Sequence, residues 1–337
     1  MASISKVVVF PGDNCGPEVM SEALKVLRVF ESQKEPIKFD FDFRLLGGKW
    51  GTGLVRPEQG LLGLRKGMDA FGNLRPCNFA AESLVDLSPL KADVARGTNF
   101  TIIRELCGGM YFGPDRRDPD ADLTSAQDVD FYTRQEIERV ARLAGYLAKQ
   151  HDPPLPVWSL DKANVLASAG RLWRLVVSEV FEKEFPDVQL GHHLIDSAAM
   201  LMIKRPTALN GIVLTSNLFG DIISDEASVI PGSLGLLPSA SLCEVPVPGK
   251  LVKGIYEPIH GSAPDIVGKG IVNPAGMILC AAMMLRYSFG KEAEARAIEM
   301  AVADTINNGV RTGDIGGTAG TKEFGDAVVK HLKSRMV

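Results

Sequence analysis

The sequence predicts an α/β protein of about two domains, and the reasons are its length and the order of its elements. The chain has 337 residues, and short apolar runs alternate with stretches of helical periodicity along most of it. Such alternation is typical of a sheet flanked by helices. Because no internal repeat or long linker interrupts the pattern, one α/β architecture is expected throughout.

The N-terminal part begins with a short buried strand, Lys6–Phe10, which a Pro-Gly-Asp turn separates from a helix at Glu18–Phe30. The alternation of Phe and Asp in Phe39–Leu46 predicts a half-buried strand, because successive side chains of a strand point to opposite faces. Pro57 is favourable in the first turn of a helix, which is expected to run to about Met68.

The middle of the chain is predicted to hold two strands, Phe100–Leu106 and Val157–Leu160, with a helix after each. The first of these helices starts at a capping box, Thr133-Arg-Gln-Glu136. Its apolar side chains recur at helical spacing on one face, at Ile137, Val140, Ala141, Ala144 and Leu147. The second helix is expected at Arg171–Glu184.

The last third is predicted to be mostly helical. Asp196 is expected to be the N-cap of a helix that ends before Pro206. The apolar strand Gly211–Thr215 leads into a further helix. Three helical blocks then complete the chain, broken by Gly290 and by the glycine-rich residues 309–320.

Composition and charge limit the class of function. A net charge of −4 and a pI near 5.8 argue against a nucleic-acid or membrane partner. The five cysteines are widely spaced and form no C-x-x-C pattern, so neither a disulfide framework nor a zinc site is expected. The first residues show no secretory or organellar targeting pattern. The protein is therefore expected in the cytoplasm, a reducing compartment.

Two aspartates, Asp221 and Asp225, lie four residues apart on one face of their predicted helix. Like charges at this spacing repel each other, so the pair either faces water or meets positive charge. A solvated polar stripe is one interpretation. The other is ligation of Mg²⁺ or Mn²⁺, which prefer carboxylate oxygens. Asp196 is a third candidate ligand.

Three arginines are candidates for gripping an anionic substrate. Arg65 lies in a predicted helix, Arg75 lies in Asn-Leu-Arg-Pro, and Arg104 follows an apolar run. A charge after such a run is costly unless it leaves the core or is paired. Three guanidinium groups together can clamp carboxylates bidentately. Ordinary ion pairing is the simpler explanation for any one of them alone.

Two further side chains are candidates for proton transfer. Lys162 stands at the end of a predicted strand, and ligands of α/β folds gather at the carboxyl ends of strands. Tyr111 lies in Gly108-Gly-Met-Tyr-Phe-Gly113, where glycines allow a ligand to approach the backbone closely. An aromatic side chain packed under a loop is the alternative for Tyr111.

The usual nucleotide signatures, G-x-G-x-x-G and G-x-x-x-x-G-K-[ST], do not occur. The turn-like run Tyr256–Asp265 instead combines glycine, small polar residues, His260 and Asp265. Such a run can line a pocket for a ribose and an adenine, or it can be a polar surface loop.

The order of these motifs resembles the β-decarboxylating dehydrogenases, the family of isocitrate and isopropylmalate dehydrogenases. The run Thr215–Pro238 is similar to the family signature, and Arg75 in Asn-Leu-Arg-Pro matches as well. The resemblance covers nearly the whole chain. It also includes Arg104 with Tyr111, the Asp-Lys-Ala-Asn that holds Lys162, and the run that ends at Asp265.

This resemblance implies a two-domain fold with a large mixed sheet flanked by helices, not the Rossmann fold. Residues 1–72 and 231–337 would form a cofactor-binding domain, and residues 73–230 a domain for substrate, metal and dimerisation. It also implies an NAD-dependent homodimer of fungal type. Its reaction would convert 3-isopropylmalate to 4-methyl-2-oxopentanoate and CO₂, a step of leucine biosynthesis.

The resemblance also implies the residue roles. Arg65, Arg75 and Arg104 would grip the carboxylate that leaves as CO₂. Asp221 and Asp225, with Asp196 of the second subunit, would hold Mg²⁺ or Mn²⁺. Asp221 would also contact the substrate through this cation. Lys162 of the second subunit would help take the hydroxyl proton, and Tyr111 would protonate the carbon left by CO₂.

Substrate and cofactor preference follow from two short segments. Glu58, Leu61 and Leu62 precede Arg65, and the two leucines suit a branched alkyl group. A single methylene changes binding by only about 1–3 kcal/mol, so a related alkylmalate stays an alternative substrate. The NAD contacts implied by the resemblance are Glu257, His260, Gly261, Ser262, Ala263, Asp265 and Asn273. A carboxylate at Asp265 accepts from a ribose 2′-hydroxyl and repels a 2′-phosphate.

The sequence departs from the family after Gly47-Gly48, where a block on the order of thirty residues is absent. The block has the size of one crossover helix and a strand. Removing a strand leaves the backbone groups of its neighbours unpaired unless the sheet pairs again. An inactive variant that serves as a dimer partner is therefore a further alternative.

Overall fold

The computed structural model describes residues 4–33, 35–46, 57–119 and 122–336, without the side chains of Pro57 and Glu58. Its strands are β1 Ile4–Val9, β2 Lys38–Phe43, β3 Gly72–Asn78, β4 Asn99–Glu105, β5 Val157–Asp161, β6 Leu190–Leu194, β7 Gly211–Thr215, β8 Pro238–Leu242 and β9 Gly254–Pro258. Its helices are α1 Gly16–Val29, α2 Pro57–Met68, α3 Ala92–Ala95, α4 Arg134–Ala148, α5 Ala169–Glu184, α6 Ile195–Lys204, α7 Asn217–Ser228, α8 Ala275–Tyr287, α9 Glu292–Asn307 and α10 Thr321–Arg335.

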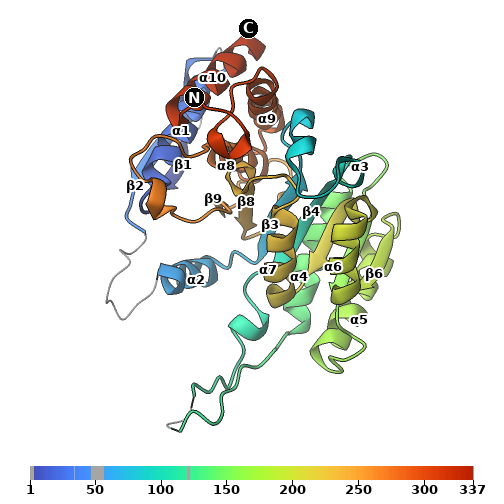
Figure 1. Cartoon of the computed structure of the whole chain (residues 1–337). Coiled ribbons are helices and arrows are strands. Elements are labelled where there is room, and N and C mark those ends of the chain that lie inside the picture. The colour runs from blue at the N-terminus through green and yellow to red at the C-terminus, as the bar shows by residue number, and fades with distance from the viewer. Residues whose placement is uncertain (1–3, 34, 47–56, 120–121, 337) are drawn as a thin grey trace.

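A seven-stranded mixed sheet forms the centre of the molecule, in the order β6-β5-β7-β4-β3-β8-β9 (Figure 1). The strands from β6 to β4 are parallel, and β3, β8 and β9 join them by antiparallel pairing. A second sheet contains β1 and β2, which are parallel. The predicted α/β fold with a large mixed sheet is confirmed.

Helices cover both faces of the large sheet, because strand side chains alternate between the faces. On β4, Phe100 and Ile102 pack in a cluster with residues of α6 and α7. Ile103, whose side chain points to the opposite face, packs on the other side with residues of α4 and α5. The sheet therefore holds α7 directly beside the end of β4, where Arg104 lies.

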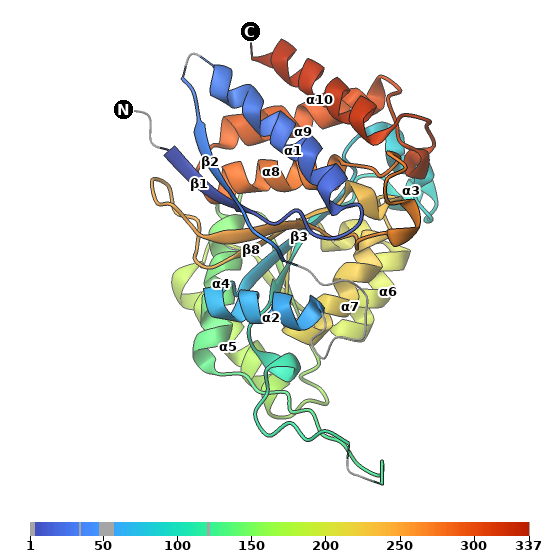
Figure 2. The ribbon, with the colours of Figure 1, turned by 90° about the vertical axis from the view of Figure 1, so that its left-hand side faces the viewer.

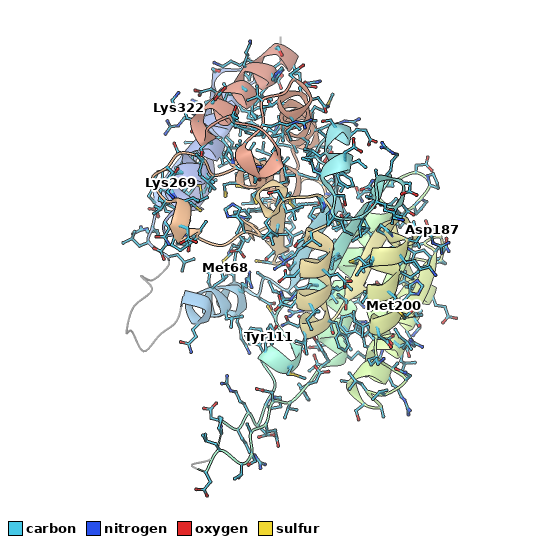
Figure 3. The ribbon with its side chains drawn as sticks, viewed as in Figure 1. Met68, Tyr111, Asp187, Met200, Lys269 and Lys322 are labelled. Atoms are coloured by element: carbon cyan, nitrogen blue, oxygen red, sulfur yellow. The ribbon has the colours of Figure 1, made fainter. Side chains whose placement is uncertain are left out.

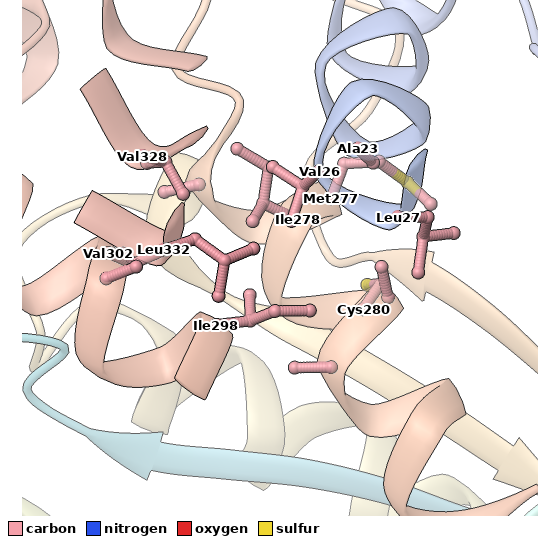
Figure 4. Close-up of a cluster of buried hydrophobic side chains, with 14 of the residues drawn as sticks. Ala23, Val26, Leu27, Met277, Ile278, Cys280, Ile298, Val302, Val328 and Leu332 are labelled. Carbon is pink, nitrogen blue, oxygen red and sulfur yellow. The ribbon is translucent and has the colours of Figure 1, made fainter. Parts of the chain in front are cut away.

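A separate core joins α1, α8, α9 and α10 (Figure 4). Val26 of α1, Ile278 of α8, Val302 of α9 and Leu332 of α10 are each fully buried in it. The inner face of β1 and β2 packs against the same core through Val7, Phe39 and Phe41. The turned view in Figure 2 shows β1 and β2 lying beside α1.

Most predicted elements are found within a few residues of their expected bounds, and the capping box at Thr133 is formed. One detail is wrong: Asp196 lies inside the first turn of α6, and Leu194 is the N-cap residue. The reason is that β6 runs directly into the helix. No helix of the described residues is long and apolar enough to cross a membrane.

The predicted domain boundaries stay a prediction. The large sheet runs across them, since β3 pairs with β4 on one side and with β8 on the other. The expected change after Gly47-Gly48 falls on residues 47–56, which lie outside the described residues.

Candidate active site

Arg104 is the most buried of the predicted charged site residues, with a side chain only 3 % exposed. Its Nη1 donates to Oδ1 of Asp221 at 2.5 Å. Its Nε and Nη2 donate to Oδ1 of Asn217 at 3.0 and 2.8 Å. Burial lowers the pKa of Arg104, and the charge of Asp221 opposes this shift. The strand end and the first turns of α7 thus fix one guanidinium between two acceptors.

Tyr111 completes the pairing of Asp221 from the turn after β4 (Figure 3). Its hydroxyl donates to Oδ2 of Asp221 at 2.5 Å, and the guanidinium of Arg104 lies 5.6 Å from its ring centre. Desolvation and the hydrogen bond to Asp221 raise the pKa of Tyr111 to about 12. The phenol is therefore protonated at neutral pH and able to donate.

Asp225 meets a second arginine one turn further along α7. Nη1 of Arg75 donates to Oδ1 of Asp225 and to Oγ of Ser224, each at 3.0 Å. Arg75 is itself held by Oδ1 of Asn73 at 3.0 Å. The repulsion between the two aspartates is thus offset by two guanidinium groups. Arg75, Arg104, Tyr111, Asp221 and Asp225 are called the acid–arginine cluster below.

Arg65 connects this cluster to the predicted cofactor residues. Its Nη2 donates to Oε1 of Glu257 at 2.6 Å, and both side chains are largely buried. The charges of Arg75 and Arg65 both lower the pKa of Arg104, so the three arginines act on one another. The Nε of Arg65 is buried and has no partner among the described residues. The three predicted arginines are therefore gathered at one place.

The loop after β9 brings the other predicted cofactor residues close to the N-terminal turn. Nδ1 of His260 lies 2.9 Å from the carbonyl oxygen of Gly261, and its buried Nε2 has no partner in the part of the chain that is described. Ser262 accepts from Nδ2 of Asn14 at 3.2 Å and, through its carbonyl oxygen, from the backbone N–H of Cys15 at 3.1 Å. The turn at residues 12–16 therefore anchors this loop.

The other residues predicted to contact the cofactor or the substrate differ in their exposure and in their partners. Ala263 has a φ of +42°, and Asp265 lies exposed in the turn that follows. Asn273 is buried, and its side chain bonds Asp314 and the N–H of Ala275, so both its polar ends are used inside the protein. Leu61 lines a cavity next to the loop and Leu62 is half-buried, whereas the side chain of Glu58 is not described.

Lys162 and Asp196 form a separate pair, with Nζ and Oδ1 2.8 Å apart. The hydrogen bond from Lys162 lowers the pKa of Asp196. Within the described ranges, no three acidic, histidine or cysteine side chains come together as a metal-binding group. Asp221 and Asp225 supply carboxylate oxygens, which are the ligand atoms that Mg²⁺ and Mn²⁺ prefer. These two residues fit a divalent cation, but the described residues of one chain alone do not bring a third ligand to them.

Two side chains that sequence reasoning did not single out support the cluster. Asn217 accepts from Arg104 and donates to the carbonyl oxygen of Gly108 at 2.9 Å. Glu105 is fully buried and accepts from the N–H groups of Cys107 and Gly108 at 3.0 and 2.8 Å. The sequence could have indicated a role for Glu105, because it stands beside Arg104 at the end of an apolar strand. A second charge buried there also requires hydrogen-bond partners.

Comparison with known families shows to which protein family the chain belongs. The family described as isocitrate/isopropylmalate dehydrogenase matches residues 44–328. The chain belongs to this family. A 3-isopropylmalate dehydrogenase A of Aspergillus niger is 58 % identical, over 97 % of this chain and 98 % of its own length. A 3-isopropylmalate dehydrogenase of Zymoseptoria tritici is 56 % identical, over 97 % and 98 %.

Solved structures of isocitrate/isopropylmalate dehydrogenases and their relatives agree with the fold. The isocitrate dehydrogenase of Methylococcus capsulatus has a TM-score of 0.80 and 28 % identity, and the match covers 98 % of this chain and 99 % of that one. The alignment with the Aspergillus niger relative extends over 359 residues, although this chain has 337. That relative therefore contains residues without a counterpart here, and their position after Gly47-Gly48 stays a prediction.

Proposed function

We propose that this member of the isocitrate/isopropylmalate dehydrogenase family is an NAD-dependent enzyme that oxidises and decarboxylates 3-isopropylmalate, a step of leucine biosynthesis. The observation that carries the proposal is the acid–arginine cluster, in which two arginines, two carboxylates and a protonated tyrosine meet at the end of β4. The fungal relatives named 3-isopropylmalate dehydrogenase support the choice of substrate.

The arginines would bind the carboxylate that is lost as CO₂. Arg104 and Arg75 carry their charge into a largely buried position, where a carboxylate gains more from pairing than it does in water. The Nε of buried Arg65, which no described residue accepts from, is a further donor for an anionic ligand. Leu61 and Leu62 of α2 would contact the branched alkyl group, which supports an alkylmalate over a tricarboxylate.

Tyr111 and Lys162 would move the protons. Tyr111, protonated at neutral pH, would give its proton to the carbon that loses CO₂. Lys162 would take the proton of the C2 hydroxyl as that carbon is oxidised. Asp221 would accept from Tyr111 and so keep the phenol aimed at the substrate.

NAD and a divalent cation fit the residues present. NAD would lie against His260 and Ser262 and supply the hydride acceptor. The buried Nε2 of His260, which has no partner in the described part of the chain, supports a ligand there. Exposed Asp265 supports NAD over NADP by repelling a 2′-phosphate. Asp221, Asp225 and Asp196 of a second subunit would hold Mg²⁺ or Mn²⁺, which when bound polarises the oxygen at C2.

A homodimer would bring Asp196 and Lys162 of one subunit to the cluster of the other. Large apolar side chains on two neighbouring helices support such an interface. Met200 and Ile203 of α6 are 66 % and 59 % exposed. Ile222 of α7 and Val229, which directly follows α7, are 62 % and 53 % exposed (Figure 3 labels Met200). Exposed apolar side chains gathered in this way mark protein interfaces. The five free cysteines support a cytoplasmic location.

A direct assay tests the function. The purified protein is mixed with 3-isopropylmalate, Mg²⁺ and NAD⁺, and the absorbance of NADH is followed. NADH should form with 3-isopropylmalate and not with isocitrate, and it should stop forming when a chelator removes the cation. A protein of normal dimer mass that forms no NADH would refute the proposal.

Mixed dimers test the shared site. Lys162→Met and Asp221→Asn should each be inactive alone, whereas re-annealed mixtures should recover about a quarter of wild-type activity, because half of the dimers then hold one intact site. The control is a mixture of Lys162→Met with Asp196→Asn. Both of these residues serve the neighbouring site, so that mixture should recover nothing.

A further inference from the structure

A cavity of about 660 Å³ lies between β1 and β9, which belong to different sheets. Its walls are mostly apolar and come from both strands and from α1, α2 and α8. They include Val7, Val8, Tyr256, Met277, Cys280 and Met284. Figure 4 shows Met277 and Cys280 on α8, beside α1. This cavity is called the strand slot below.

The edge of β1 that faces the slot has unpaired backbone groups. The carbonyl oxygen of Val9 accepts from the N–H of Arg44 at 2.9 Å, so the polar groups of Val9 point toward β2. Backbone groups of successive strand residues point to opposite sides. Those of Lys6 and Val8 therefore point away from β2, and both residues line the slot. Among the described strands, β1 pairs with β2 alone.

The edge of β9 has the same property. The N–H of Ile259 donates to the carbonyl oxygen of Leu237, and the carbonyl oxygen of Lys253 accepts from Cys243, so these residues point toward β8. By the same alternation, the backbone groups of Gly254 and Tyr256 point away from β8. Both residues line the slot, and β9 is the terminal strand of the large sheet in the described chain.

The outer face of β1 also lacks a cover. Ile4 and Val8 lie on that face and are 62 % and 52 % exposed. Apolar side chains of this size in a strand are normally packed against another element, and an open apolar edge invites pairing with another chain. Both the edge and the face of β1 are therefore incomplete.

The comparisons supply one observation that bears on what would complete them. The relative from Aspergillus niger contains residues that this chain lacks. The family match begins at residue 44, directly after β2, and Leu46 lines the slot. The predicted cofactor residues Glu257, His260 and Ser262 line the slot only where the chain leaves β9. A dinucleotide at that end leaves the backbone groups of β1 and β9 without partners along the rest of the slot.

We propose that the strand slot binds an extended apolar strand from a second polypeptide, which pairs with β1 on one side and β9 on the other. Such strand addition takes its affinity from main-chain hydrogen bonds and its specificity from the pockets for alternate side chains. Here the inner side chains of the added strand would pack on α1 and α8. The strand would join the two sheets into one.

A synthetic peptide tests the proposal. The probe is the segment of the Aspergillus niger relative that has no counterpart in this chain. The full chain should bind it with one-to-one stoichiometry in calorimetry, and its Tm should rise. Hydrogen exchange should slow at the amides of Lys6, Val8, Gly254 and Tyr256. A peptide of the same composition with proline at alternate positions is the control and should not bind.

A variant pair tests the direction of the hydrogen bonds. Val8→Pro removes the N–H that faces the slot and leaves the groups that pair with β2, so it should weaken peptide binding about tenfold. Val8→Ala shortens the same side chain but keeps the N–H, and should bind within about twofold of the parent. If Val8→Pro does not fold, hydrogen exchange on the parent chain tests whether the peptide pairs with β1 and β9.

Three results would overturn the proposal. The first is the absence of binding with the peptide in large excess. The second is binding without slower exchange at β1 and β9. The third is protection of the Lys6 and Val8 amides in the free chain, because the edge would then already be paired. Protection that rises with protein concentration alone would assign the slot to a second copy of the chain instead.

Discussion

The acid–arginine cluster and the strand slot differ in how their polar groups are satisfied. In the cluster, every charged side chain has a partner within hydrogen-bonding distance. At the slot, the backbone groups of two strand edges face an apolar cavity, and the described chain supplies no third strand. The cluster rests on the centre of the seven-stranded sheet, while the slot lies where the two sheets meet. The side chains of the cluster are thus paired within one chain, whereas the strand edges at the slot have no third strand among the described residues.

The largest effect is expected from Asp221→Asn in the cluster. The change removes a proposed cation ligand and the charge that Arg104 and Tyr111 share, so turnover should fall by roughly three orders of magnitude. NADH formation measures it, and circular dichroism checks the fold. Retention of wild-type turnover would show that the paired cluster is only structural.

Glu105 should make stability depend on pH. Burial raises its pKa to about 7, against the ordinary value of 4.5. Because the folded state holds the proton more tightly, the stabilisation is complete below about pH 4.5 and is lost as pH rises through about 7, at most about 3 kcal/mol. Urea unfolding of the parent and of Glu105→Gln across this range measures it. The parent should lose more stability than the variant; equal slopes would contradict the prediction.

Asn217→Ala tests whether the cluster depends on positioning. Arg104 loses its second acceptor and the carbonyl oxygen of Gly108 loses its donor, which costs roughly 1–3 kcal/mol for buried groups. KM for 3-isopropylmalate should rise about tenfold or more, with a smaller change in kcat. Asn217→Asp retains the acceptor for Arg104 and should recover part of the loss. A purely structural role would lower Tm without changing KM.

The smallest effect is expected at the open edge. Ile4→Val removes a methylene that is largely in water and should change the free energy of unfolding by less than about 0.5 kcal/mol. Ile102→Val makes the same change at a fully buried position of β4 and should cost about 1 kcal/mol. Denaturant unfolding of both variants measures the difference. Equal costs would mean that the outer face of β1 is covered in solution.

The local elements were largely predictable, since helices such as α4 and strands such as β7 follow from periodicity and capping. Strands β3, β6, β8 and β9 were not predicted, because they contain proline, glycine or serine, so only pairing with neighbours makes them strands. The position of Asp196 was missed for a similar reason: a strand that continues into a helix leaves no capping signal.

The sequence by itself determined which chemistry is present: two acids one turn apart, three arginines near element ends, and a tyrosine between glycines. The resemblance to the family predicted in addition that a block is absent after Gly47-Gly48. Only the tertiary structure decided that Arg104 pairs with Asp221 and Arg75 with Asp225, because these partners are far apart in the chain and meet through sheet packing. It also decided that the edges of β1 and β9 border one apolar cavity, because strands far apart in the chain meet through the packing of the sheets and helices.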